Sequence, residues 1–435
     1  MGSYVPSTNA ERQEMLKVIG VNSIRDLYCN VPQDMFIKEL NLPEGLSELE
    51  LRRELTKISE KNVVFPTCLR GAGSYRHFIP ATVKAITGRE EFLTAYTPYQ
   101  AEISQGILQS IFEYQTMMCE LTGMDVSNAG VYDVGTAAAE SITMCRDRKR
   151  TKAYVAATVQ PDVLETMKTY CLGSGVELTV IPAVNGRVDK EALKAALGAD
   201  AAMFYLQQPN YYGLLEDATE IGQIVHAAGA KYVMGFNPIA AAILPTPAEC
   251  GADVAVGEGQ PLGMDTAFGG PYLGIMTTNK AMTRNLPGRI VGQTVDKDGN
   301  IGYVLTLSAR EQHIRREKAS SNICSNQQLC AFTAGVYLAS VGEVGLRQAA
   351  VSSMSKAHYL AEKLEKELGW KRVYEGEYFH EFVTECPDAE KALSVLAKNG
   401  ILGGLKVEEG LLWCATELVS KEELDQAVAL LKEAF

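Results

Sequence analysis

Three side chains in the stretch YTPYQ are suited to orienting a small molecule. Tyr96, Tyr99 and Gln100 flank a proline just before an expected helix, so a rigid turn would present them outward. Hydroxyl and amide groups can orient a small amino acid without adding charge. A turn that caps the helix and packs against the N-terminal segment would use the same residues. The sequence leaves both interpretations open.

A second polar stretch, CLRGAGSYRHFIP, contains Arg70, Arg76 and His77. A guanidinium group can hold a carboxylate through two parallel hydrogen bonds, which is suitable for a substrate that carries a carboxylate. The same residues could equally form ion pairs at an interface. Substrate binding and subunit contact are therefore both possible for this stretch.

A glycine pair, Gly269 and Gly270 in AFGGPYLG, could bring backbone N–H groups close to a phosphate. The alternative is a tight turn at the edge of a sheet. Neither a G-x-G-x-x-G turn between a strand and a helix nor a G-x-x-x-x-G-K-[ST] loop occurs in the chain. The sequence therefore argues against a dinucleotide or nucleoside-triphosphate site.

The elements that must position these residues alternate between strand and helix. Apolar runs predict strands at residues 152–158, 176–182, 201–207, 231–236, 253–258 and 272–278. Helical patterns occupy residues 102–123, 136–150, 163–173, 190–197 and 217–229, and Gly123 ends the first of them as a C-cap. Apolar strands alternating with helices predict an α/β fold with a mostly parallel sheet of about seven strands, covered on both faces.

Three regions follow from this pattern. Residues 1–90 are expected to form a helical N-terminal arm or cap, which either reaches another subunit or covers its own chain. Residues 91–325 form the large α/β domain, and residues 326–435 form a linking helix and a small C-terminal α/β domain. Asn322 or Ser321 could be the N-cap of the linking helix.

Composition excludes several classes of function. The 435 residues carry a net charge of −12 with no basic stripe, which argues against nucleic acid or an anionic membrane as the main partner. Ten cysteines are scattered without a metal-binding pattern, as expected for buried free thiols in a reducing compartment. We find neither a secretory signal nor a membrane-spanning apolar run, so a soluble, cytoplasmic protein is expected.

The order of these parts resembles the layout of fold type I pyridoxal-phosphate enzymes. Such enzymes need a lysine at the end of a late strand for the Schiff base and a carboxylate that keeps the pyridinium nitrogen protonated. They also need a helix N-terminus that binds the phosphate. Asp133 and Thr136 mark such a helix N-terminus in this chain, where we interpret them as capping residues and a remnant of a phosphate pocket.

Five motifs make the resemblance specific. They are YTPYQAEISQG, YDVGTAAAES, GADVAVGEGQPLG, FGGPYLG and RREKASSNICSNQQL. Together they resemble glycine decarboxylase, the P-protein of the glycine cleavage system, and more narrowly the first (alpha) subunit of its two-subunit bacterial form. The resemblance covers essentially the whole chain. It implies pyridoxal phosphate as cofactor, glycine as substrate, a beta subunit as partner in an α/β pair or a dimer of such pairs, and the lipoylated H-protein as acceptor of the aminomethyl group.

The groups that hold the cofactor in the beta-type chain are absent here. Aligned on the shared Gly-Gly-Pro with that chain's NLHKTF and PHGGGGPG segments, this sequence places Gln260 at the Schiff-base lysine. Met234 lies near the position of the pyridinium aspartate, and Lys231 and Lys280 are misplaced as substitutes. An amide cannot form an imine and a thioether cannot stabilise a protonated ring nitrogen. We therefore expect no catalytic residue in this chain and pyridoxal phosphate bound covalently by the partner only.

The resemblance also assigns a role to the glycine pair. In fold type I dimers the loop after the lysine position commonly contacts the phosphate of the neighbouring subunit, so Gly269 and Gly270 are expected to contact the partner's cofactor. The alternative function is a non-catalytic scaffold or regulatory homodimer that retained the fold. A self-sufficient enzyme with another cofactor is the least favoured function, and Gln260 and Met234 argue against an independent pyridoxal-phosphate enzyme.

Overall fold

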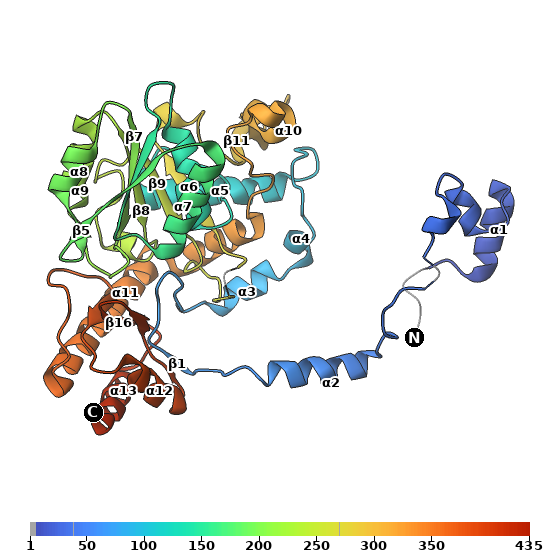
Figure 1. Ribbon diagram of the computed structural model, residues 1–435. Helices are drawn as coiled ribbons and strands as arrows, with labels where there is room; N and C mark the ends of the chain where they lie inside the picture. Colours follow the sequence, from blue (N-terminus) through green and yellow to red (C-terminus); the bar gives the residue numbers. More distant parts are fainter. Residues whose placement is uncertain (1–5, 38, 269) are drawn as a thin grey trace. The chain divides into compact units, whose positions relative to one another are not determined.

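The computed structural model describes residues 6–37, 39–268 and 270–435, and the chain divides into two compact units, Met1–Val64 and Phe65–Phe435 (Figure 1). The first unit contains helices α1 (Asn9–Ile19) and α2 (Glu48–Ser59) and the short 3-10 turns η1 (Ile24–Tyr28) and η2 (Gln33–Met35). Both α-helices begin with a capping box, in which Thr8 or Ser47 exchanges hydrogen bonds with a glutamate three residues later. Helix α2 exposes the apolar side chains Leu49, Leu51, Leu55 and Ile58.

A seven-stranded sheet forms the centre of the second unit, in the strand order β2-β10-β9-β8-β7-β3-β4. The strands are β2 (Val126–Ser127), β10 (Gly274–Thr278), β9 (Val254–Glu258), β8 (Lys231–Phe236), β7 (Ala201–Gln208), β3 (Lys152–Ala156) and β4 (Leu178–Ile181). Only β10 runs antiparallel to its neighbours. Six strands lie where the apolar runs predicted them. The seventh, β2, has two residues and is too short to show a periodicity.

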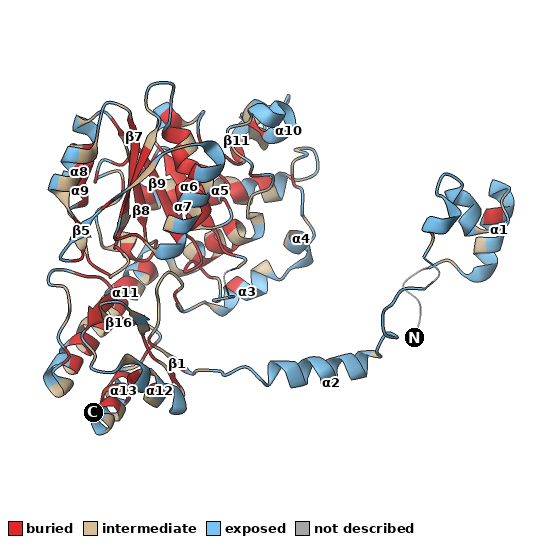
Figure 2. Ribbon diagram, viewed as in Figure 1, coloured by how far each residue is buried: buried red, intermediate tan, exposed pale blue. Residues whose placement is uncertain are grey.

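Helices enclose this sheet, and its central strands are buried (Figure 2). They are α5 (Gln105–Thr122), α6 (Val134–Cys145), α7 (Pro161–Ser174), α8 (Lys190–Ala196) and α9 (Ala218–Ala227). The short helices α3 (Ala81–Thr87) and α4 (Glu90–Leu93) precede them along the chain. Gly123 ends α5 in the left-handed conformation, with φ 70°, as the sequence predicted. The near-continuous apolar sequence of β7 and β9 thus reflects burial on both faces.

Helix α11 (Gln328–Leu368) connects the two cores of the second unit. Gly342 interrupts it with φ 61° and ψ −175°, so two helices meet at a kink there. Ala334 and Tyr337 belong to the core of the sheet, whereas Leu360 belongs to the C-terminal core. One 18-residue window of α11 has a mean hydropathy of 1.5, enough to cross a membrane by composition. Of the residues in that window, 28% are buried.

The predicted caps of this helix are wrong. Helix α11 begins at Gln328, six residues beyond Asn322, and its N-cap is Gln327. The Ser321 hydroxyl instead accepts a hydrogen bond from the Ile323 N–H at 3.1 Å, within the preceding loop. Serine and asparagine are common N-cap residues, but a loop follows Ser321 and Asn322 here and the helix begins only at Gln328.

The C-terminal core combines a small antiparallel sheet with two helices. Strands β13 (Glu381–Thr384), β16 (Gly410–Cys414) and β15 (Leu405–Val407) pair in that order and pack with α12 (Ala389–Lys398) and α13 (Lys421–Ala434). Strand β1 (Thr67–Cys68) pairs in parallel with β14 (Ile401–Leu402), which holds the start of the second unit against this core.

Two further features were not expected. A hairpin of β11 (Ile290–Val295) and β12 (Ile301–Thr306) precedes α10 (Gln312–Arg315), and a smaller pair joins β5 (Ala183–Val184) to β6 (Arg187–Val188). The ten cysteines are free, as predicted, although Cys29 and Cys324 are exposed rather than buried.

Gly274 allows β10 to touch the beginning of α6. A Cβ atom at this position would lie 2.3 Å from the Asp133 carbonyl oxygen, and backbone cannot yield as a flexible side chain does. Gly274→Ala should therefore lower the free energy of unfolding by about 1–3 kcal/mol, measured as a lower thermal midpoint. Gly335→Ala is the matched control, since its Cβ would meet no atom closer than 3.9 Å. Equal midpoints for the two variants would contradict this account.

Candidate functional site

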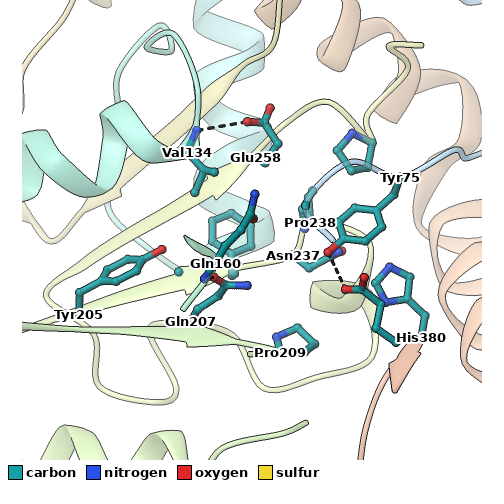
Figure 3. A pocket seen from close by; sticks show the side chains of 15 residues that line it. Tyr75, Val134, Gln160, Tyr205, Gln207, Pro209, Asn237, Pro238, Glu258 and His380 are labelled. Carbon is teal, nitrogen blue, oxygen red and sulfur yellow. Dashed lines mark hydrogen bonds between the residues drawn. The ribbon is translucent and has the colours of Figure 1, made fainter. Parts of the chain in front are cut away.

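A small pocket lies at the carboxyl ends of β7, β8 and β9 (Figure 3). The strand ends contribute Gln207, Asn237 and Glu258, while Tyr75 and Glu381 come from two distant segments of the chain. The carboxyl ends of parallel strands are the usual ligand site in open α/β sheets. The pocket leaves about 40 Å³ for water-sized molecules. Because one water needs about 10–15 Å³ on this measure, a few waters fill it.

Gln260 follows β9 and is completely buried. Its side-chain oxygen accepts a hydrogen bond from the Tyr75 N–H at 2.9 Å. Its amide nitrogen donates to the carbonyl oxygens of Tyr75, at 2.9 Å, and Met264, at 2.8 Å. At the position where the resemblance expects a lysine, the chain therefore has an amide that ties the Tyr75 segment to the sheet. Its polar atoms are all engaged within the protein.

Met234 lies in the middle of β8 and is 1% exposed. It pairs with Leu206 on β7 and Ala255 on β9, and it belongs to the main apolar core. Met234 does not line the pocket, whereas the next residue, Gly235, does. At this position of the strand the chain therefore presents an apolar packing residue.

The N-terminus of α6 faces the same strand end. Asp133 is its N-cap, and its carboxylate accepts a hydrogen bond from the Thr136 N–H at 2.7 Å, as the sequence predicted for a capping residue. A second carboxyl group, that of Glu258, accepts from the Val134 N–H at 3.2 Å. It also accepts from the N–H groups of Gln260 and Leu273, both at 3.0 Å. The chain's own carboxyl groups thus occupy the anion-binding end of this helix.

Burial raises the pKa of Glu258 to about 8. The three backbone N–H donors act in the opposite direction because they favour the carboxylate, and the nearby charge of Asp133 raises the pKa further. The sequence analysis did not select Glu258 as a site residue. The feature that could have indicated it is an acidic residue at the end of an otherwise apolar strand, two positions before Gln260.

The glycine loop lies after Gln260. Gly269 is outside the described residues. The Gly270 N–H donates to the Ala267 carbonyl oxygen at 3.1 Å, so a turn already uses this amide. A Cβ atom at Gly270 would meet no atom closer than 3.9 Å. Phe268 is fully exposed at the tip of the loop.

The YTPYQ residues do not line the pocket. Tyr96 is 82% exposed, and the Tyr99 ring lies under the Arg289 guanidinium, whose central carbon is 4.4 Å from the ring centroid. Gln100 is exposed, and its carbonyl oxygen accepts from the Ser104 N–H at 3.1 Å within the turn before α5. The structure therefore places these three residues at the surface, around the beginning of a helix.

Arg70, Arg76 and His77 contact backbone and the C-terminal core. The Arg70 guanidinium donates to the Gly404 carbonyl oxygen at 2.9 Å, and His77 Nδ1 lies 2.7 Å from a Glu417 carboxylate oxygen. Arg76 donates to the Phe65 carbonyl oxygen at 3.3 Å. The structure brings none of the three into the pocket beside Glu258, although it does bring their neighbour Tyr75 there.

Glu381 and His380 complete the pocket and were missed from the sequence. Glu381 accepts from the Tyr75 hydroxyl at 2.7 Å and from the Ala72 N–H at 2.6 Å, and burial raises its pKa to about 7. His380 is 1% exposed, and burial, together with the nearby His77, holds its pKa well below the usual range. The only signal was a pair of titratable residues at the start of an expected strand, HEFVTEC.

Comparison with known proteins agrees with this architecture. The sequence model of the glycine cleavage system P-protein matches residues 2–431. The chain belongs to this P-protein family. The probable glycine dehydrogenase (decarboxylating) subunit 1 of Desulfitobacterium hafniense is 45% identical over 439 residues, with 98% of each chain covered. The corresponding protein of Carboxydothermus hydrogenoformans is 46% identical, over 98% of this chain and 99% of its own.

Solved structures lead to the same family. The crystal structure of glycine decarboxylase (P-protein) of the glycine cleavage system in inhibitor-bound form is 39% identical, with a TM-score of 0.94 over 100% of both chains. A sphingosine-1-phosphate lyase of Burkholderia pseudomallei has a TM-score of 0.67 at 14% identity, covering 92% of this P-protein chain and 93% of its own, and shows the fold alone. The predicted family and the fold type I architecture are confirmed.

The buried Glu258 predicts a pH dependence of stability. Its pKa is about 8 in the folded chain and near 4.5 when unfolded, so between these values the folded state holds a proton that the unfolded state releases. Stability from this group is therefore present at low pH and is lost as the pH rises through that window, by at most about 1.4 kcal/mol per pH unit. In Glu258→Gln, the free energy of unfolding in urea should fall less steeply between about pH 5 and pH 8. An unchanged slope would show that Glu258 is ionised throughout.

Proposed function

We propose that this chain is the lysine-lacking subunit of a two-subunit glycine decarboxylase. Together with a lysine-bearing beta subunit, it decarboxylates glycine and transfers the aminomethyl group to the lipoyl group of the H-protein. The observation that carries this proposal is the full-length likeness to proteins named subunit 1 of glycine dehydrogenase (decarboxylating). The residue at the position where the resemblance expects the lysine, Gln260, agrees with it. Pyridoxal phosphate, bound by the partner, supplies the electron sink for the reaction.

The pocket of this chain does not fit the cofactor. Sites for ligands of this size usually measure roughly 300–1,000 Å³. The pocket here leaves about 40 Å³, and neither lysine nor arginine is among the described residues that line it. Glu258 already accepts the Val134 N–H at the start of α6, so this donor is not free for a phosphate group. We therefore derive no catalytic step in this pocket and assign the chemistry to the partner subunit.

Several exposed apolar side chains support a protein partner. Phe268 is fully exposed beside the glycine pair, and α2 exposes four apolar residues on a charged helix. Aromatic residues such as Phe268 are frequent anchors at interfaces. We propose that the loop containing Gly270 and Phe268 meets the beta subunit near its cofactor. The surface residues Tyr96 and Gln100 remain candidates for the same interface, and Arg76 is a further one.

The alternative is a scaffold or regulatory homodimer that retained the fold. The two functions differ in what this chain does to the partner's cofactor. A subunit that completes the site must change cofactor binding or turnover in the complex, whereas a scaffold leaves both unaffected.

Borohydride reduction tests the assignment of the cofactor. The chain alone and the α/β complex would be incubated with pyridoxal phosphate, reduced and analysed by intact-mass and peptide mass spectrometry. We expect a reduced adduct on the beta subunit and none on this chain, because Gln260 cannot form an imine. The Gln260→Lys variant is a useful comparison, although its pocket is too small for the cofactor and it should stay unlabelled. A stoichiometric adduct on any lysine of the wild-type chain would overturn the proposal.

Gly270→Val tests the contact between the loop and the partner's cofactor. Space around Gly270 is free in this chain, so the new side chain should leave its thermal midpoint unchanged. In the complex the side chain should push the phosphate away from the loop. The loss of a charge-assisted hydrogen bond weakens binding of pyridoxal phosphate by about tenfold to a hundredfold. Absorbance titration of the complex measures this affinity.

Gly173→Val is the matched control, because Gly173 is also exposed with no atom within 4 Å of its Cβ position. It lies in α7, away from the glycine loop, and should leave cofactor affinity unchanged. Normal cofactor binding by Gly270→Val would mean that the loop is only a turn at the sheet edge.

A further inference from the structure

Phe268, in the glycine loop, has both a strained backbone and an exposed aromatic ring. Its φ angle is 51°, in the left-handed region, and its side chain is fully exposed. A bulky residue in that region is a true outlier, because its Cβ atom crowds the backbone. Such a conformation persists only where other interactions compensate for it. Since the ring itself is fully exposed, packing of the ring within this chain does not provide that compensation.

The two ends of the glycine loop hold Phe268 in this conformation. Before it, the Gln260 side chain donates to the Met264 carbonyl oxygen at 2.8 Å. After it, the hydroxyl groups of Tyr272 and Ser74 share a hydrogen bond of 2.7 Å, and Tyr272 is 8% exposed. The conformation at the tip is therefore imposed by buried contacts at the ends of the loop.

The surface beside the loop has the composition of a protein interface. Residues 264–266 line a hollow together with Arg76, Phe78 and Leu418, and it leaves about 250 Å³ for water-sized molecules. Phe78 is 59% exposed, and the exposed Arg76 bonds to backbone carbonyl oxygens. Aromatic and arginine side chains are enriched at protein interfaces. A projecting ring next to such a hollow fits a partner that has an apolar pocket for the ring.

We propose that Phe268 is a preformed anchor that inserts into an apolar pocket of the lysine-bearing beta subunit, positioned by the Ser74–Tyr272 hydrogen bond. This inference rests on the proposed function, which assigns a beta subunit to the chain. Burial of the ring removes apolar area from water, and this gain compensates for the strained backbone. A loop that is already held in its bound conformation also loses less conformational entropy on association.

A second copy of this chain suits the loop less well. Each copy carries a net charge of −12, which opposes self-association. The likeness to proteins named subunit 1 also favours a different chain as the partner.

Thermal melting of the isolated chain tests the strained backbone. Phe268→Gly and Phe268→Ala both remove the ring, so they differ only in the backbone conformations that they allow. Glycine normally lowers stability relative to alanine because it is more flexible in the unfolded chain. At position 268 the order should be reversed, since glycine adopts the left-handed conformation without strain. A higher midpoint for Phe268→Ala would overturn the inference of a strained, preformed anchor.

Subunit exchange tests the anchor. The full chain would be labelled with a fluorophore, assembled with the beta subunit and chased with excess unlabelled chain. Phe268→Gly and Phe268→Ala should both dissociate about tenfold faster or more, as expected when an aromatic anchor at an interface is truncated. Leu172→Ala is the matched control, because Leu172 is 86% exposed on α7, and its dissociation rate should equal that of the wild type.

A double-mutant cycle tests the positioning bond. Ser74→Ala and Tyr272→Phe should each speed dissociation severalfold while Phe268 is intact. The double variant should dissociate no faster than either single variant, because both changes remove the same hydrogen bond. The control is Tyr212→Phe, which removes a hydroxyl bonded to Glu409 at 3.0 Å, and it should behave as the wild type.

The outcomes separate this inference from the proposed function. Wild-type dissociation rates for both Phe268 variants would overturn the inference and leave the proposed function in place, because the complex still forms. Failure of the chain to form any complex with the beta subunit would overturn both. A homodimer that Phe268→Gly abolishes would identify a second copy as the occupant and would also overturn the inference. Thermal melting checks that each variant is folded, and if Tyr272→Phe does not fold, Ser74→Ala decides the role of the bond.

Discussion

The hydrogen bonds accepted by Glu258 are the interaction on which the architecture of the site depends. One carboxyl group accepts N–H groups from the start of α6, from the loop after β9 and from the residue before β10. A helix N-terminus leaves its first N–H groups unsatisfied, and a buried one needs acceptors. Glu258 supplies one from the end of the adjacent strand. Three segments of the sheet are thereby fixed by a single side chain that the chain provides itself.

This arrangement extends to the C-terminal core. Gln260, two residues after Glu258, binds the backbone of Tyr75, and the Tyr75 hydroxyl binds Glu381 at the beginning of β13. The same N-terminal segment is held by the contact of His77 with Glu417. Hydrogen bonds therefore run without interruption from the helix N-terminus to the small sheet. The pocket between them leaves about 40 Å³ for water-sized molecules.

This chain has the core of the P-protein family and strand-end side chains that are satisfied within the protein. The chain superposes on a P-protein structure over its full length, with a TM-score of 0.94. The two proteins therefore share the sheet and the helices that pack on its apolar core. An amide and a thioether stand at the positions considered for the lysine and the aspartate, and both are satisfied or packed inside the chain. The structural demands of the pocket are met without a ligand of that size.

Local sequence was sufficient to predict the long elements. Strands β3, β7, β8 and β9 are continuous apolar runs, and the ends of two helices follow from Gly123 and Asp133, because periodicity and capping depend on neighbouring residues. The absence of a lysine at position 260 is likewise a property of the sequence itself. The two-residue strands β2 and β14 and the β11–β12 hairpin escaped prediction, since so short or so exposed a segment carries little periodic signal.

Only the tertiary structure brought Tyr75, Glu258 and Glu381 together. They are separated by more than a hundred residues along the chain, and their distances depend on how the strands cross and how the two cores pack. The roles of Arg70 and His77 were decided in the same way, because their partners are a carbonyl oxygen and a carboxylate near the other end of the sequence. The sequence by itself determined which long elements form, and it predicts that the Schiff-base lysine is absent. Packing between distant segments determined what fills its place, because burial and hydrogen bonding depend on neighbours in space.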